Sequence, residues 1–218
     1  MDDIPPRAWQ RMLSGRRLDL LDPSPLDVEI EDIAQGLSRV ARWNGQTSGP
    51  HPFSVAEHSL VVERILGEMR PVPGPAERLA ALLHDAPEYV IGDMISPFKA
   101  ALGIDYRAFE ARLAEAVHVR FGLPAHLPEA WEKRIKRADR LCAWFEATQL
   151  AGFTQAEAAR FFPRPRAAWA AGIVLDPGPA EAVRAAFVAR FAVLSAALAT
   201  SGDRRQAAGR GAPPPTSS

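Results

Sequence analysis

The sequence predicts an all-α protein, a helical bundle of about six to eight helices. Apolar residues recur at helical spacing along most of the chain, and turns rich in Pro and Gly separate these segments. No convincing series of alternating strands is present. The chain has 218 residues, of which 47% are hydrophobic, so it can bury one sizeable core. We therefore expect an irregular N-terminal segment (1–30), one helical domain (31–200) and a disordered tail (201–218).

The N-terminal segment is rich in Pro and Asp and predicts turns with one short pair of strands. After it, Ile33, Leu37 and Val40 follow helical spacing and predict a helix over 31–41. The next residues contain Asn-Gly and Gly-Pro, which are typical of a loop.

A helix is expected from Ser54 to about Met69 because "SVAE" forms a capping box, in which Ser54 caps the backbone and Glu57 reaches back. A second helix is expected over 76–86. Pro87 cannot donate a backbone hydrogen bond, so this helix should kink or stop near the adjacent His-Asp pair.

The remaining periodic segments predict four further helices. They cover about 105–121, 129–152, 155–161 and 179–200. The last 18 residues, "SGDRRQAAGRGAPPPTSS", are rich in Gly, Pro and Ser and predict disorder.

Composition excludes several classes of protein. Lys+Arg and Asp+Glu are 26 each, so no global basic field favours nucleic acid. The single cysteine, Cys142, excludes an intrachain disulfide framework and a multi-cysteine zinc site, and favours a reducing compartment. No signal peptide is recognised, and no run of about 18 apolar residues suggests a membrane span. We expect a soluble, cytoplasmic protein without a nucleic-acid or membrane partner.

Polar side chains occupy inward positions on three of the expected helices. His58 lies three residues after Val55 on an apolar stripe, and Asp139 lies four residues after Ile135. Between them, the segment "LLHDAPEYVIGD" places His84 and Asp85 at the end of an apolar run. Buried charges are costly unless they are paired or bound to metal.

Two imidazoles and two carboxylates suit one divalent metal ion, and Mn, Fe, Co, Ni, Zn or Mg are all compatible. Four protein ligands on an octahedral ion leave about two positions for water and substrate. Water on such an ion becomes a nucleophile near neutral pH.

The order His58, His84-Asp85, Asp139 resembles the HD-domain metal-dependent phosphohydrolase superfamily. The segments "SVAEHSLVV", "AALLHDAPEYVIGDMISPFK" and "KRADRLCAWFEA" resemble the bacterial 5′-deoxynucleotidases of that superfamily. The upstream segment "DIAQGLSRVARWNGQT" is similar to a compact phage and bacterial branch that includes dATP triphosphohydrolases. The resemblance covers roughly residues 15–150.

The resemblance implies that those four residues are the metal ligands and that Glu88 is the catalytic carboxylate. Asp93 matches an acid that orders the site or assists in proton transfer. The implied substrate is a small-molecule (deoxy)nucleotide, and a homodimer is compatible with the family.

Three further residues match the family's substrate side. Arg42 and Lys99 match phosphate-binding residues, and Trp43 matches a tryptophan that crowds the sugar. A guanidinium suits phosphate because it donates two parallel hydrogen bonds. The loop after Trp43, "NGQTSGPHP", departs from the deoxynucleotidase pattern, so monophosphate and triphosphate substrates both stay open.

Alternatives remain at the level of sequence. A dimetal cyclic-nucleotide phosphodiesterase would need His118 and His126 at the site, and an alarmone hydrolase would need motifs that are not found. A metal- or nucleotide-binding regulator on the same scaffold is a non-enzymatic alternative. The basic run "KRIKR" at 133–137 is interpreted as a solvated helix face, and Cys142 as buried and inert.

Overall fold

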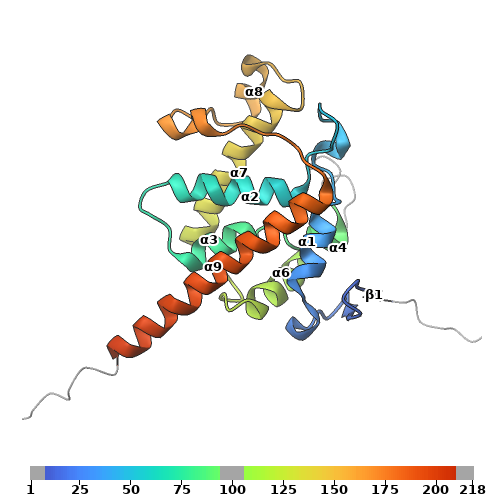
Figure 1. Ribbon diagram of the computed structural model, residues 1–218, viewed down its shortest axis with the longest axis vertical. Coiled ribbons are helices and arrows are strands. Elements are labelled where there is room, and N and C mark those ends of the chain that lie inside the picture. Colours follow the sequence, from blue (N-terminus) through green and yellow to red (C-terminus); the bar gives the residue numbers. More distant parts are fainter. Residues whose placement is uncertain (1–7, 94–105, 210–218) are drawn as a thin grey trace, which may run out of the picture.

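The computed structural model describes residues 8–93 and 106–209, and confirms the all-α class. The described residues form eight α-helices, three short 3-10 helices and one two-stranded hairpin (Figure 1). The α-helices are α1 (Ile30–Leu37), α2 (Val55–Glu68), α3 (Pro75–Leu82), α4 (Glu88–Ile91), α6 (Tyr106–Arg120), α7 (Glu129–Gln149), α8 (Gln155–Phe161) and α9 (Ala180–Gly209). The 3-10 helices are η1 (Pro25–Asp27), η2 (Arg42–Gly45) and η3 (Ala168–Gly172).

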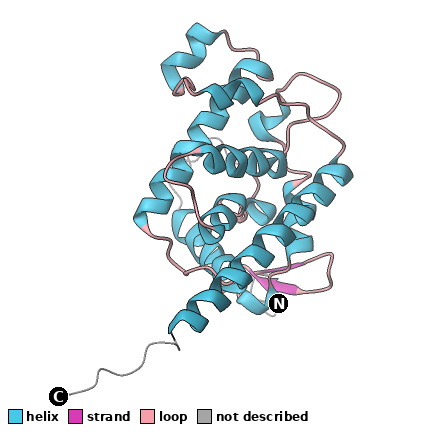
Figure 2. Ribbon diagram, turned by 60° about the vertical axis from the view of Figure 1, so that its left-hand side comes forward, coloured by secondary structure: helices cyan, strands magenta, loops and turns pink. Residues whose placement is uncertain are grey.

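The N-terminal segment contains the expected pair of strands, β1 (Trp9–Arg11) and β2 (Arg17–Asp19), which are antiparallel. Figure 2 shows them as the magenta hairpin at the edge of the helical body. The backbone N–H and the hydroxyl of Ser14, in the turn between the strands, both donate to the Asp32 carboxylate on α1. The hairpin is therefore fastened to the bundle through its turn.

Helix α2 begins at the capping box that the sequence predicts. The Ser54 hydroxyl accepts from the Glu57 backbone N–H at 3.3 Å, and the Glu57 carboxylate accepts from the Ser54 N–H at 2.9 Å. Two of the otherwise unpaired amides at the helix start are satisfied in this way. This fixes where α2 starts, and therefore fixes His58, one turn further on.

Helix α3 ends at Leu82, four residues earlier than the sequence suggests. Pro87 has no N–H to give to the Leu83 carbonyl, which instead accepts from the Ala86 N–H at 2.9 Å in a tighter turn. The residues from Leu83 to Pro87 form turns, and α4 starts at Glu88. The His-Asp pair thus lies in a turn between two helices rather than on a helix.

Helix α7 ends at Gln149 rather than near residue 152. Gly152, just beyond it, adopts a positive φ of 76°, a conformation that glycine reaches without strain. Helix α7 packs against α2, and these two helices carry the centre of the bundle (Figure 1).

Helix α9 crosses α1, α2 and α3, and its C-terminal half extends beyond the body (Figure 1). It is helical to Gly209, so part of the tail expected to be disordered is helical. Its Phe187 is fully buried where α9 packs on the bundle, and its Arg190 forms two hydrogen bonds with the buried Glu63 of α2.

The composition of α9 bears on the expectation that the chain has no membrane span. Its segment Ala180–Ser201 has a mean hydropathy of 1.7, long and apolar enough by composition alone to cross a membrane. The segment is not the unbroken apolar run that the sequence was searched for, because it contains Glu181, Arg184 and Arg190. In the fold, however, one side of α9 packs on the bundle, so length and composition are weak grounds for a span.

Candidate metal centre

Four side chains from α2, α7 and the turn after α3 converge on one point. His58 Nε2 lies 3.3 Å from His84 Nε2 and 3.4 Å from Asp85 Oδ2. Asp139 Oδ1 lies 3.5 Å from the same His58 nitrogen. Asp85 Oδ2 also lies 3.3 Å from His84 Nε2. All four residues that the sequence suggests as metal ligands are therefore brought together.

Hydrogen bonds on the far side of each ring define where the histidine protons are. His58 Nδ1 lies 2.6 Å from Glu146 Oε1, and His84 Nδ1 lies 2.9 Å from the Ala81 carbonyl oxygen. A carboxylate and a carbonyl only accept hydrogen bonds, so both Nδ1 atoms carry a proton. In neutral rings the two Nε2 atoms then present lone pairs to each other.

The centre of the cluster is therefore surrounded by electron-pair donors, two nitrogens and two carboxylates, and it fits a cation. Burial lowers the pKa of His84, but Asp85, Asp139 and the Ala81 carbonyl together raise it by more. Burial raises the pKa of Asp85, but His84, His58 and Arg42 together lower it by more, to well below its usual range. Both pKa shifts have the same cause, which is that the carboxylates of the cluster stabilise a positive charge beside them. Borderline divalent metals accept this mixture of imidazole and carboxylate ligands.

The cluster is closed on one side and open on the other. The side chains of His58 and Glu146 keep none of their surface exposed. His84, Asp85 and Asp139 keep 12%, 23% and 15% of theirs. Water and a small ligand can therefore reach the cluster from the side of the carboxylates.

Glu146 on α7 is the main residue of the site that sequence reasoning missed. Besides His58, its carboxylate accepts from Trp43 Nε1 at 2.7 Å and from Cys142 Sγ at 3.2 Å. Arg42 Nε lies 3.5 Å away. Burial raises the pKa of Glu146, but His58 and Arg42 lower it by more, to about 2. A fully buried carboxylate thus stays ionised because several donors surround it.

The position of Glu146 could have revealed it. Ile135, Asp139, Cys142 and Glu146 follow one another at helical spacing on one face of α7, and the first three were recognised as inward. An acid that continues an inward face needs a partner, which is the signal for a functional or supporting role.

His58, Cys142 and Glu146 form a second group with donor atoms close enough for an ion. Burial holds the pKa of the Cys142 thiol well above its usual range. The thiol therefore keeps its proton, and the Glu146 oxygens already accept hydrogen bonds. This group supports the first one rather than offering a second open site, and Cys142 is buried as expected.

Glu88, expected to be catalytic, is the first residue of α4 and is 4% exposed. Burial lowers the pKa of Arg42, but a ring of carboxylates raises it by more. These are, in decreasing order of effect, Glu146, Asp85, Asp93 and Glu88. Glu88 thus lies in the electrostatic environment shared by the metal cluster and Arg42.

Asp93 accepts a hydrogen bond from Arg42 Nη1 at 3.1 Å, across 51 residues of sequence. It follows Gly92, whose φ of 74° turns the chain back toward the site. Of the two roles expected for Asp93, the geometry fits the ordering of the site through Arg42.

Trp43 has an unusual backbone, with φ of 56°, and Asn44 follows at 50°. Left-handed conformations cost about 1–3 kcal/mol at residues other than glycine. The indole N–H bond to Glu146 holds this conformation, and the ring packs against Phe153 and Phe162. The residue is half-buried beside the site. Lys99 lies outside the described residues.

Two histidines lie elsewhere. His118 on α6 has its Nδ1 3.1 Å from the Ala125 carbonyl oxygen. His126 is 83% exposed, with Glu115 as its neighbour. Neither belongs to a candidate metal group among the described residues.

A comparison with protein-family models finds none that matches the chain. A curated protein of Rhodobacter capsulatus, itself named only as uncharacterized, is 58% identical over 192 residues. The aligned region covers 88% of this chain and 98% of that protein.

Proposed function

This chain belongs to the same family as the uncharacterized Rhodobacter capsulatus protein, and we propose that it is an HD-type, metal-dependent phosphohydrolase acting on (deoxy)nucleotides. The observation that carries the proposal is the meeting of His58, His84, Asp85 and Asp139, from three separate elements, around His58 Nε2. A one-metal site with this donor set is the one that the sequence resemblance implies.

In this proposal the four side chains hold one divalent ion. The ion, when bound, would supply Lewis-acid polarisation of a phosphoryl oxygen and would acidify water at neutral pH. The identity of the metal is not fixed by the donor set, because Mn, Fe, Co, Ni, Zn and Mg all accept it.

The chain's own residues then divide the remaining work. Glu88, which is buried and contributes to the electrostatic environment of Arg42, would take the proton from the attacking water. Arg42 would neutralise phosphate charge, with Asp93 holding its Nη1 and leaving Nη2 to donate. Trp43, fixed by Glu146, would border the sugar or base.

The placement of the remaining histidines favours hydrolysis at one metal over the dimetal phosphodiesterase alternative. That alternative needs His118 and His126 among the ligands, and both have neighbours elsewhere. The experiment below distinguishes a monophosphate substrate from a triphosphate substrate. It also distinguishes an enzyme from a non-enzymatic regulator.

The test is phosphate release by metal-stripped protein to which Mn²⁺, Co²⁺ or Mg²⁺ is returned. The substrates are dNMPs, dNTPs, NMPs, cyclic nucleotides and alarmones, with products separated by chromatography. Orthophosphate from dNMPs would identify a 5′-deoxynucleotidase, and inorganic triphosphate from dNTPs a triphosphohydrolase. An inert protein that still binds metal would reject the enzyme and leave the regulator.

A further inference from the structure

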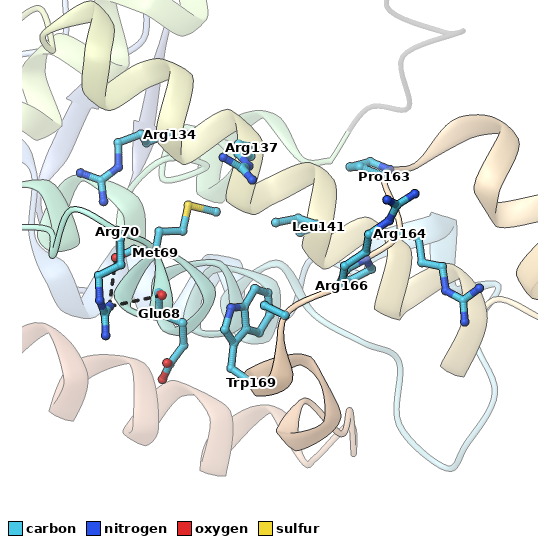
Figure 3. A pocket seen from close by; sticks show the side chains of 12 residues that line it. Glu68, Met69, Arg70, Arg134, Arg137, Leu141, Pro163, Arg164, Arg166 and Trp169 are labelled. Carbon is cyan, nitrogen blue, oxygen red and sulfur yellow. Dashed lines mark hydrogen bonds between the residues drawn. The ribbon is translucent and has the colours of Figure 1, made fainter.

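A second concave site lies away from the metal cluster. It has a volume of about 600 Å³ and is formed by the end of α2, one face of α7 and the segment between α8 and η3 (Figure 3). Its lining residues are Glu68, Met69, Arg70, Arg134, Arg137, Leu141, Pro163, Arg164, Pro165, Arg166, Ala167 and Trp169. Figure 3 shows the α7 side chains facing Met69 and Trp169.

The lining is strongly positive. It includes five arginines and only one carboxylate, in a chain whose Lys+Arg and Asp+Glu are balanced at 26 each. Arg134 is neutralised by Glu77 at 3.0 Å. Arg137, Arg164 and Arg166 form no ion pair with any described residue. The positive charge of this cavity therefore exceeds the negative charge of the described residues around it.

The end of α2 does not cancel this charge. Carbonyl groups at a helix C-terminus carry partial negative charge. Here the Glu68 and Met69 carbonyls accept hydrogen bonds from Arg70 Nη1, at 3.3 and 3.2 Å. The Arg70 guanidinium is therefore engaged at the helix end, whereas Arg137 and Arg166 have no such partner among the described residues.

The cavity also has an apolar part. Met69 and Trp169 are half-buried, and Leu141 is 8% exposed. An indole beside arginines offers a stacking surface next to phosphate-binding groups. Pro163 and Pro165 restrict the backbone of the covering segment, so it is partly ordered before any ligand binds.

The cavity and the metal cluster use different faces of α7. Arg134, Arg137 and Leu141 are spaced by three and four residues, whereas Asp139 lies about 200° around the helix from Arg137. Along α2, Glu68 lies ten residues after His58, a rise of about 15 Å. A ligand in the cavity therefore does not occupy the metal cluster.

We propose that this arginine-lined cavity binds an oligophosphate anion, either inorganic or carried by a nucleoside. Guanidiniums recognise phosphate oxygens through paired charge-assisted hydrogen bonds, and several of them on facing walls favour more than one phosphate group. The volume lies within the usual range for small-molecule sites, about 300–1,000 Å³. The proposal does not depend on the hydrolytic function proposed above.

The experiment is isothermal titration calorimetry of the full chain with inorganic tripolyphosphate and with ATP. EDTA is present, and the salt concentration is about 150 mM, at which exposed charges more than about 8 Å apart are largely screened. The test variant is Arg137→Ala/Arg166→Ala. Its matched control is Arg112→Ala/Arg160→Ala, which removes the same charge from exposed positions outside the cavity. A further variant, Arg42→Ala, reports binding at the metal cluster.

We expect the Arg137/Arg166 variant to bind at least about tenfold more weakly. The loss of a single hydrogen bond between charged groups weakens affinity by about that factor. The control should bind as the unaltered chain does, and Arg42→Ala should keep the binding event that the Arg137/Arg166 variant loses. Tighter binding of ATP that Trp169→Ala removes would identify a nucleoside ligand; equal binding of both probes would identify an inorganic one.

Three results would overturn the proposal. One is no binding of either probe. Another is loss of binding in Arg42→Ala alone, which would place the anion at the metal cluster. The last is equal weakening in the test and control variants, which would show unspecific attraction. Circular dichroism of each variant checks that the fold is retained.

Discussion

Helix α7 carries acids on one face and arginines on another. The two faces differ in how far their charged side chains are buried and in how many partners these side chains have. On the acidic face, Glu146 is fully buried and meets donors from His58, Trp43 and Cys142. On the other face, Arg137 is exposed and has no ion-pair partner among the described residues. Burial makes an unpaired charge costly, whereas exposure lets water solvate it.

This difference in burial determines which measurement reveals the role of each face. A buried carboxylate that is fully hydrogen-bonded has been organised by the fold, so changing it should disturb several neighbours at once. An exposed guanidinium can be changed with little effect on stability, so only a ligand-binding measurement reveals its role. The effects expected on the acidic face can be ranked.

The largest effect is expected from Asp85→Ala. It removes a ligand from the centre of the cluster and leaves His58 and His84 without the carboxylate that faces both rings. Bound metal, measured by mass spectrometry, and hydrolysis should both fall to background. Asp176→Ala is the control, because Asp176 is exposed and forms no ion pair with any described residue. Full activity in Asp85→Ala would reject the proposed site.

Glu88→Gln should separate chemistry from metal binding. The amide keeps the shape of the side chain but cannot take a proton, so turnover should fall by about 10²–10⁴-fold. Metal content should stay unchanged, because Glu88 is not among the converging ligands. Glu31→Gln, at an exposed position of α1, is the control. Unchanged turnover would remove Glu88 from the mechanism.

Glu146→Gln should have an intermediate effect. The substitution removes the negative charge that orients His58 and holds Trp43, so metal affinity should fall by about 10–100-fold, the usual range for groups that position a ligand. Metal competition titrations measure this, and NMR of the His58 ring reports its tautomer. Glu132→Gln, on an exposed position of the same helix, is the control. An unaltered affinity and tautomer would show that Glu146 is only structural.

The smallest perturbation uses Cys142, the one thiol in the chain. It is fully buried, and burial holds its pKa well above its usual range, so little thiolate is available to react. Ellman's reagent should therefore detect no thiol in the native protein and one thiol after denaturation. Rapid reaction of the native protein would mean that the acidic face opens to solvent.

Local signals in the sequence predicted much of this arrangement. The capping box placed the start of α2, and helical spacing placed His58 and Asp139 on inward faces. Pro87 predicted an interruption near His84, although the helix ends four residues earlier than expected. Such features depend on residues only a few positions away in the chain, so the sequence predicts them directly.

Contacts between distant segments could not be predicted. The Arg42–Asp93 pair spans 51 residues, and Trp43 reaches Glu146 across 103. The run at 133–137 was interpreted as a solvated helix face, which Arg137 is in part. Arg137 also lines the cavity, because the segment 163–169 folds across α7. Tertiary packing brings these groups together, and no local pattern encodes it.

The ion pair between Arg190 and Glu63 has a consequence for how the protein is made. The two residues are 127 positions apart, and Glu63 is 2% exposed in the finished fold. At translation rates of about 5–20 residues per second, roughly 6–25 s pass between the synthesis of Glu63 and that of Arg190. During that interval the surface of α2 and α3 that α9 will cover stays open on the nascent chain. At this stage the surface that α9 later covers is accessible to chaperones and can take part in aggregation.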